Sequence, residues 1–236
     1  MNISKTTNVK PSDLNYDRYT RNQYDRDIVR AIPAHQELHE RLCKFLLKKY
    51  LPTQTIQILD LGTGTAITSA LVRDVFPNTH FDLVDFSKQM LAGARKRMGG
   101  KNVHYILGDF SLVKFNQQYD IVMTVIGLHH QTSVGTRRLL KRMHRQIKPN
   151  GFFVLGDLVT YTDKHLAAFN NCKHYHYLAE NAVNDKVLMD WAYHHQFLND
   201  LKTIENYRAW LKEAGFKVVY EFSQWNTALL IAQKYN

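Results

Sequence analysis

The sequence predicts an α/β fold with a doubly wound, mainly parallel sheet that ends in an antiparallel hairpin. Two observations predict it. Between residues 56 and 155, short apolar runs alternate with amphipathic helical patterns, which is typical of parallel βαβ units. The last two apolar runs, 216–222 and 227–232, are separated by only four residues. That connection is too short for the helix of a parallel crossover, so the closing pair should be antiparallel.

Five apolar runs in the first part of the chain are the predicted parallel strands. They cover residues 56–61, 81–85, 103–107, 119–126 and 152–155. The fourth run is nearly continuous, as expected for a central strand that helices cover on both faces. Together with the closing hairpin, these runs predict a seven-stranded sheet.

The connecting helices are predicted from apolar residues that recur every three or four positions, between a polar cap residue and a terminating glycine or proline. Ser87 precedes a helix that Gly99-Gly100 ends, and Thr203 precedes one that Gly215 ends. Thr132 or Ser133 begins the helix before the fifth strand.

The chain divides into three predicted parts. Residues 1–13 are polar and are expected to form a disordered tail, and residues 14–52 a helical cap. Residues 53–236 form the main domain, which carries an insert at 158–202. The insert has few turn signals and many aromatic and histidine residues. We expect it to fold as a helical lid over the sheet.

Composition narrows the cellular setting. The chain has 236 residues and a formal net charge of +10, spread along its length, which favours anionic partners only weakly. No apolar run is long enough to cross a bilayer, and the first residues lack the apolar core of a signal peptide. Cys43 and Cys172 fit neither a disulfide framework nor a metal pattern. These features predict a cytoplasmic protein with reduced thiols.

A glycine-rich turn is the most informative motif. Residues 60–66, Asp-Leu-Gly-Thr-Gly-Thr-Ala, stand between the first strand and the next helix, and Asp85 ends the second strand. Gly62 and Gly64 let a ligand approach the backbone closely, and a carboxylate at Asp85 offers two acceptor oxygens to a vicinal diol. The pattern predicts binding of an adenosine-containing molecule.

The chain resembles the class I S-adenosylmethionine-dependent methyltransferases. The resemblance covers about residues 55–235 and rests on motifs in the family's order, with Ala66 in place of a third glycine. The motifs are residues 60–66, Asp85-Phe86, Gly108-Asp109-Phe110, Leu128-His129-His130 and residues 148–152. The resemblance implies a Rossmann-like methyltransferase fold, S-adenosylmethionine as the cofactor and S-adenosylhomocysteine as its product.

The resemblance also implies a set of cofactor-binding residues around the amino-acid part, the ribose and the adenine. They are Asp60, Gly62, Thr63, Gly64, Asp85, Phe86, Met90, Asp109, Phe110 and Ile126. Three of them have an alternative interpretation. Asp60 could instead hold its own loop in place, Asp85 could be a surface acid at a strand end, and Phe110 could belong to the core.

Catalysis is assigned to His129 and His130, which follow the central strand at the edge of the sheet where ligands bind. An imidazole titrates near neutral pH and suits a base that orients or deprotonates the methyl acceptor. The alternative is that these histidines only hold their loop. The candidate substrate-binding residues are Tyr16, Tyr24, Asp157, Tyr161, His176, Trp191 and His195. Because many of these side chains are aromatic, they favour a small, flat or aromatic substrate, which would be methylated at nitrogen or oxygen.

Two histidine pairs in the insert, His174-x-His176 and His194-His195, could supply metal ligands. Residues one or two positions apart on a helix point in different directions, and no acidic cluster accompanies them. We therefore expect no metal site in this protein.

Other functions remain open. Residues 27–33 and 205–216 resemble the carboxy-S-adenosylmethionine synthase branch, which supplies a tRNA-modification cofactor. Trp210, however, stands where that branch has the arginine that holds the extra carboxylate. The basic residues of 137–148 could contact phosphate in an RNA methyltransferase, or simply form a solvated helix face. A nucleic-acid partner is not favoured, and the sequence does not distinguish a monomer from a homodimer.

Overall fold

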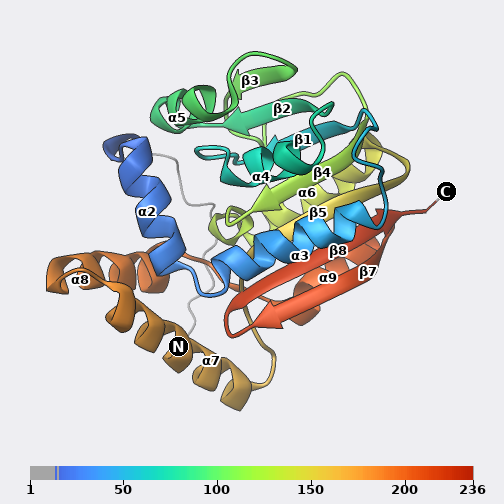
Figure 1. The fold of residues 1–236 in the computed structure, drawn as a ribbon. Helices are drawn as coiled ribbons and strands as arrows, with labels where there is room; N and C mark the ends of the chain where they lie inside the picture. Colours follow the sequence, from blue (N-terminus) through green and yellow to red (C-terminus); the bar gives the residue numbers. More distant parts are fainter. Residues whose placement is uncertain (1–13, 15, 236) are drawn as a thin grey trace.

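The computed structural model describes residue 14 and residues 16–235, and shows one central sheet with helices on both faces (Figure 1). The sequence prediction of a disordered tail at 1–13 lies outside the described residues. The strands are β1 (Gln57–Leu61), β2 (His80–Asp85), β3 (Val103–Leu107), β4 (Tyr119–Val125), β5 (Ile147–Thr160), β6 (Lys202–Thr203), β7 (Phe216–Gln224) and β8 (Thr227–Lys234).

The strand order is β3-β2-β1-β4-β5-β8-β7, with the two-residue β6 beside β5. Strands β1 to β5 are parallel, whereas β8 runs antiparallel to both β5 and β7. The predicted doubly wound sheet with a closing antiparallel hairpin is therefore confirmed. The strand order reverses between β1 and β4, and ligands of open α/β sheets bind beside such a point, at the carboxyl ends of the strands.

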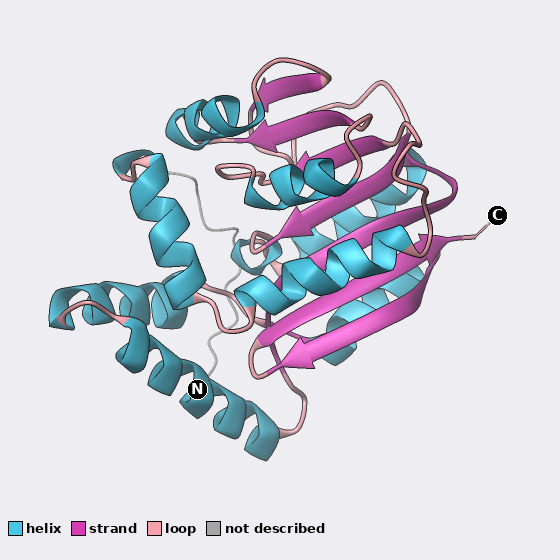
Figure 2. Cartoon of the chain, in the orientation of Figure 1, coloured by secondary structure: helices cyan, strands magenta, loops and turns pink. Residues whose placement is uncertain are grey.

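The helices form two layers and a projecting group (Figure 2). They are α2 (Arg21–Ala31), α3 (His35–Leu47), α4 (Ile67–Val75), α5 (Lys88–Met98), α6 (Ser133–Gln146), α7 (Lys164–Asn181), α8 (Asp185–Tyr193) and α9 (Ile204–Glu213). Three short turns complete the set: η1 (Tyr16–Arg18), η2 (Leu128–His130) and the π-helical η3 (His194–Leu198). Helices α3, α4 and α5 cover one face of the sheet, α6 and α9 the other, and α2, α7 and α8 lie beyond the carboxyl ends of the strands (Figure 1).

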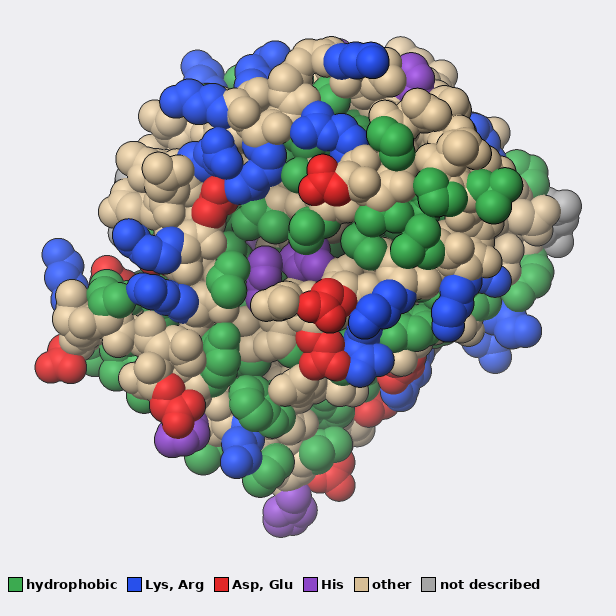
Figure 3. Space-filling model, in the orientation of Figure 1, with side chains coloured by type: hydrophobic (Ala, Val, Ile, Leu, Met, Phe, Trp, Pro, Cys, Tyr) green, Lys and Arg blue, Asp and Glu red, His purple; other side chains and the backbone are tan. Residues whose placement is uncertain are grey.

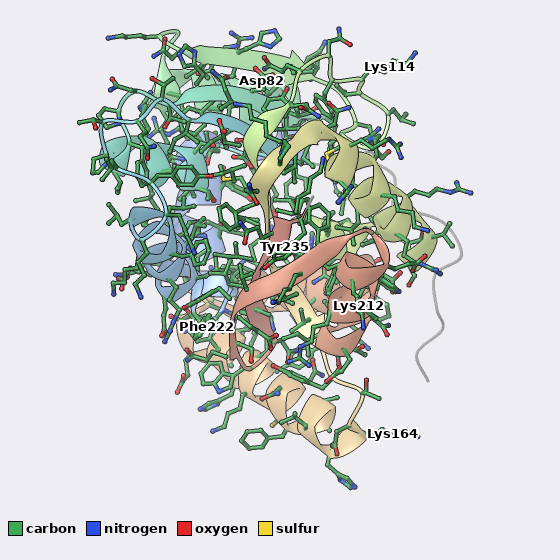
Figure 4. The ribbon with its side chains drawn as sticks, turned by 90° about the vertical axis from the view of Figure 1, so that its right-hand side faces the viewer. Asp82, Lys114, Lys164, Lys212, Phe222 and Tyr235 are labelled. Carbon is green, nitrogen blue, oxygen red and sulfur yellow. The ribbon has the colours of Figure 1, made fainter. Side chains whose placement is uncertain are left out.

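Apolar side chains fill the space on both faces of the sheet. One buried cluster joins the strands to α6 and α9, and the other joins them to α3, α4 and α5. Helix α3 belongs to the predicted cap over 14–52, yet it packs on the sheet. Its Arg41 guanidinium lies 4.1 Å from the centre of the Phe222 ring on the edge strand β7. Figure 4 shows Phe222 at this edge and Lys164 at the start of α7, far from Asp82.

The fifth strand differs most from its prediction, because β5 runs through to Thr160 and takes the first residues of the predicted insert. Residues 157 and 158 pair with β8 there. Pro149-Asn150-Gly151 does turn the chain, but as an interruption within β5. The register with β4 jumps from Ile147 to Phe152, and Asn150 has a φ of +63°. The inserted helices and η3 span residues 164–198.

Among the described helices, none combines the length and apolar character that crossing a bilayer requires. Both cysteines are free thiols, with Cys43 half-buried and Cys172 exposed on α7.

Candidate active site

The glycine loop is held by the second strand. The backbone N–H groups of Gly62 and Thr63 both donate to the carbonyl of Val84, each at 2.9 Å. Gly62 has a φ of +72° and Gly64 of +55°, a backbone region that favours glycine. The loop therefore turns sharply at the end of β1 and presents its backbone to the carboxyl edge of the sheet.

Asp60 holds this loop from inside. One of its carboxylate oxygens accepts hydrogen bonds from Thr63 Oγ1 at 2.8 Å and Ser69 Oγ at 2.6 Å. Burial raises the pKa of Asp60 to about 6, against the effect of these hydrogen bonds. Neither Asp60 nor Thr63 lines the cavity described below. Their contacts match the alternative in which the acid stabilises its own loop.

Asp85 connects the second strand to the same loop. Its Oδ2 accepts from the Gly64 N–H at 2.8 Å and its Oδ1 from the Ser87 N–H at 2.9 Å. The side chain is 6% exposed, and burial raises its pKa to about 6. Asp85 therefore lies beside the loop with its orientation fixed by two backbone donors.

A cavity, here called the cofactor cavity, opens beside Asp85. Eight of the ten predicted cofactor residues line it: Gly62, Gly64, Asp85, Phe86, Met90, Asp109, Phe110 and Ile126. Its remaining lining residues are Leu14, Tyr16, Tyr24, Gly127, His130 and Gln131.

Phe110 serves both the core and this cavity. It is 7% exposed and belongs to a buried cluster, and a Cβ added at Gly62 would lie 3.4 Å from its ring. The neighbouring Asp109 accepts from the Ser111 N–H at 2.7 Å, which fixes its loop. Phe110 is thus a core residue that also lines the cofactor cavity.

The segment that contains η1 and α2 lies over the cofactor cavity. The Tyr24 hydroxyl would lie 3.5 Å from a Cβ added at Gly64, and burial raises the pKa of Tyr24. Asp25, the next residue, accepts from Thr65 Oγ1 at 2.5 Å and pairs with Arg97. These contacts fasten α2 to the glycine loop and to α5.

A second cavity, here called the aromatic cavity, shares part of its lining with the first. Its lining residues are Tyr16, Tyr19, Tyr24, Asp27, Ile28, Ala31, Ile32, Ile126, His129, Leu158, His174, Leu178, Trp191, His194, His195 and Asn199. Tyr16, Tyr24 and Ile126 line both cavities. None of the described residues that line it is a lysine or an arginine, and its one acidic residue is Asp27.

His129 forms a buried pair with Asp157. Its Nδ1 lies 2.5 Å from Asp157 Oδ1, and the two side chains are 2% and 0% exposed. Asp157 also accepts from the Tyr207 hydroxyl at 3.2 Å and from the Leu158 N–H at 2.9 Å. Because an ionised carboxylate can only accept, we assign the proton of His129 to Nδ1, which leaves a lone pair on Nε2.

His130 lies at the junction of the site with the N-terminal segment. The Tyr16 hydroxyl is 3.2 Å from its Nε2, and the Leu198 carbonyl is 3.3 Å from its Nδ1. His130 lines the cofactor cavity, whereas His129 lines the aromatic cavity. The structure therefore brings both predicted catalytic residues to the boundary between the two cavities.

Three of the predicted substrate residues do not lie where they were expected. His176 is exposed and pairs with Glu180 at 3.1 Å, because the buried side of α7 is formed by Asn170, His174 and Leu178. Tyr161 donates to the Trp225 carbonyl at 2.6 Å and lines neither cavity. Asp157 lies behind His129 instead of facing the cleft. The other four, Tyr16, Tyr24, Trp191 and His195, line the aromatic cavity.

His174 was not among the predicted substrate residues, although its spacing with Asn170 and Leu178 marks the inner side of α7. Its Nε2 is 3.1 Å from the Ala31 carbonyl, and its ring centre lies 4.1 Å from that of His195. Burial lowers the pKa of His174 to about 4 and that of His195 to about 2. Both imidazoles are therefore neutral at physiological pH.

Several basic side chains of residues 137–148 interact with other groups of the same chain. Arg137 and Lys141 both pair with Glu213, at 2.8 and 2.7 Å. Lys148 pairs with Asp120 at 2.9 Å, and Arg142 donates to the carbonyls of residues 110 and 111. Figure 3 shows the opposite face of the sheet, on which lysine and arginine side chains are interspersed with hydrophobic and other side chains.

Comparisons with known proteins agree with this geometry. Residues 58–151 match a family model described as a methyltransferase domain. A malonyl-[acyl-carrier protein] O-methyltransferase of Bacillus cereus is 31% identical over 111 residues, which are 47% of this chain and 37% of that protein. The Neorickettsia risticii protein of the same name is 31% identical over 147 residues, 61% of this chain and 56% of that protein. The matches thus span less than two thirds of either relative.

A solved structure shares the fold. The O-methyltransferase family 2 protein of Planctomyces limnophilus, in complex with apigenin, superposes with a TM-score of 0.56 at 17% identity, over 76% of this chain and 50% of that one. These matches do not confirm the closer resemblance to the carboxy-S-adenosylmethionine synthase branch. The solved structure confirms the expected methyltransferase fold, and residues 58–151 are similar to the methyltransferase domain of S-adenosylmethionine-dependent enzymes.

Proposed function

We propose that the protein transfers a methyl group from S-adenosylmethionine to nitrogen or oxygen of a small, flat or aromatic molecule. The observation that carries this proposal is the contact between the two cavities. Tyr16, Tyr24 and Ile126 line both, so a ligand in the cofactor cavity would meet an acceptor in the aromatic cavity at these residues. Methyl transfer needs this arrangement, because nucleophile, methyl carbon and sulfur must align.

The cofactor-binding residues are proposed to be the eight that line the cofactor cavity. Asp85 offers its carboxylate to the ribose hydroxyls, and the backbone at Gly62 and Gly64 admits the amino-acid part. Phe86, Met90 and Phe110 supply apolar surface to the adenine, and Asp109 an acceptor for its amino group.

His129 is proposed as the base. S-adenosylmethionine supplies a methyl group already activated by its sulfonium. His129 Nε2 takes the proton of the acceptor as the new bond to the methyl carbon forms, and the electron pair of the breaking C–S bond stays on sulfur. Asp157 keeps the proton of the imidazole on Nδ1 and stabilises the charge that His129 gains. Asp157 is a positioning residue, since it does not line the aromatic cavity.

The lining of the aromatic cavity narrows the substrate class. Tyrosines, histidines and Trp191 suit a flat molecule, while the absence of lysine and arginine among the described lining residues disfavours a free carboxylate or phosphate. We therefore propose a neutral or weakly cationic acceptor, unlike the malonyl group in the names of the two relatives.

The alternatives have less support. An RNA methyltransferase would need free cations at the cavity mouth, yet Arg137, Lys141 and Lys148 pair with carboxylates of the same chain. The synthase of a carboxylated cofactor would need a cation to hold the extra carboxylate, whereas the partly buried Trp210 at the corresponding position packs edge-on against Tyr207. A cytoplasmic location and a monomeric or homodimeric state stay predictions.

The decisive experiment measures S-adenosylhomocysteine released by the purified chain with phenols, arylamines, a malonyl thioester or RNA as the acceptor. We expect release with members of the first two classes only. Mass spectrometry of the copurified ligand gives the control on the cofactor. Turnover with the thioester or RNA alone would contradict the proposed substrate class, and bound NAD would contradict the cofactor.

A further inference from the structure

We propose that His129, His130 and His194 bind a divalent transition metal ion of the zinc type. One ring nitrogen from each lies within 4.8 Å of the other two. His129 and His130 are buried and His194 is half-buried. This trio differs from the pairs His174-His176 and His194-His195, for which the sequence predicted no metal, because residues 65 positions apart meet only in the fold.

The buried pair already has the hydrogen bonds that metal-binding histidines use. His129 Nδ1 is held by Asp157 at 2.5 Å, and His130 Nδ1 lies 3.3 Å from the Leu198 carbonyl. A carboxylate or carbonyl can only accept, so each Nδ1 carries the proton and each Nε2 a lone pair. Such outer hydrogen bonds fix the tautomer and raise the basicity of a ligand imidazole.

The third histidine is brought to this pair by the backbone. His194 begins the π-helical turn η3, a type of turn frequent at functional sites. The Asn199 N–H donates to the His194 carbonyl at 3.2 Å, and the Asp200 N–H to the His129 carbonyl at 2.7 Å. The first bond closes the end of η3 and the second ties the residues after η3 to η2, and the ring centre of His194 lies 5.4 Å from that of His130.

The spacing is close to that of a bound ion. Nitrogens about 2.0–2.1 Å from a tetrahedral zinc ion are about 3.3 Å apart, so side-chain movements of about 1 Å would close the trio. The Tyr16 hydroxyl, 3.2 Å from His130 Nε2, is a contact that the ion would replace. Imidazole nitrogen selects zinc, cobalt or iron over magnesium and calcium, and three protein ligands leave a coordination position open.

The open position would lie at the boundary between the cavities, since His129 and His194 line the aromatic cavity and His130 the cofactor cavity. This step rests on the proposed function. A metal ion there would lower the pKa of an acceptor hydroxyl bound to it, and the hydroxyl would lose its proton to water. Its oxygen would then bond to the methyl carbon while the C–S electron pair stays on sulfur. In the metal-loaded protein His129 is thus a ligand, and in the metal-free protein it is the base.

The test uses tag-free, EDTA-treated full-length chain titrated with Zn²⁺ by calorimetry and with Co²⁺ by visible absorption. We expect one equivalent of either ion and the absorption bands of a four-coordinate cobalt site. His194→Ala should weaken binding at least tenfold, and Asp157→Asn about 10- to 100-fold, the usual effect of losing an outer hydrogen bond. His165→Ala, which removes an exposed histidine of α7, is the matched control and should bind like the parent.

The outcomes separate this proposal from the proposed function. S-adenosylhomocysteine affinity, measured on the same samples, should survive in His194→Ala and report that the variant is folded. Equal zinc affinity of His194→Ala and the parent, or no binding by the parent, would overturn the metal site while leaving methyl transfer intact. Zinc binding without turnover of any acceptor would retain the site and reject the proposed function.

Discussion

Asp85 and Gly64 are joined by a hydrogen bond of 2.8 Å, so the end of the second strand fixes the backbone of the glycine loop. The same carboxylate lines the cofactor cavity and is the proposed acceptor for the ribose. Hydrogen bonds from the two backbone donors lower the pKa of Asp85 less than burial raises it, so the pKa rises to about 6. The protonation state of one side chain therefore controls both the loop and the proposed ribose contact.

Cofactor affinity should fall as the pH drops through this pKa. Below about 6, protonated Asp85 loses acceptor capacity, so the Kd for S-adenosylhomocysteine should rise up to about tenfold between pH 7 and pH 5. Calorimetric titration across this range measures it. Asp85→Asn should bind weakly with a flat pH profile. Asp60→Asn is the matched control, because burial also raises the pKa of Asp60 to about 6 but its carboxylate lies outside the cavity. Loss of the pH dependence in that variant would contradict the assignment to Asp85.

Removal of the imidazole of His129 should lower kcat about 10²- to 10⁴-fold, the usual contribution of a general base, with little change in cofactor affinity. Asp157→Asn should also lower kcat and alter its pH profile, because it no longer fixes the proton on Nδ1. Tyr207→Phe removes only a 3.2 Å hydrogen bond to the same carboxylate and should change kcat much less. Steady-state kinetics of the three variants at several pH values checks the order of their kcat losses. Equal losses for Tyr207→Phe and Asp157→Asn would point to a structural role alone.

Stability should fall in mild acid because of buried neutral histidines. Burial, aided by the neighbouring His39, lowers the pKa of His35 to about 3. Below pH 6.5 the unfolded chain binds a proton that the folded side chain does not, so the free energy of unfolding decreases as the pH falls. His35 alone contributes about 1.4 kcal/mol per pH unit to this decrease, or about 2 kcal/mol between pH 6.5 and 5, whereas Asp60 and Asp85, whose pKa burial raises, contribute in the opposite direction. Urea unfolding at pH 7 and 5 measures it, and His35→Gln should reduce the difference. If the free energy of unfolding of His35→Gln differed between pH 7 and pH 5 by as much as that of the parent, His35 would have to be protonated in the folded state as well.

The sequence predicted the fold well because periodicity and turn chemistry are local. Thr132 and Thr203 cap their helices, and the hairpin pairs as expected. The end of β5 was missed because Gly156 and Asp157 interrupt the apolar run, whereas pairing with β8 decides the strand. At the site, the motif residues around the cofactor cavity were predictable, since each follows a strand end. Two contacts of the site could not be predicted, because they join segments far apart in the sequence and no local pattern indicates them. They are the pair of His129 with Asp157 and the approach of His130 to His194.

Substrate recognition should depend on the side of α8 that faces the aromatic cavity. Trp191 lines the cavity, whereas Met189, two residues earlier on the same helix, is 69% exposed. Trp191→Ala should raise the KM for the acceptor about tenfold or more, because a flat molecule loses a large apolar contact surface. It should leave the Kd for S-adenosylhomocysteine unchanged, since Trp191 does not line the cofactor cavity. Met189→Ala is the matched control and should keep both constants. If Trp191→Ala changed cofactor affinity and not the acceptor KM, the aromatic cavity would not be the acceptor site.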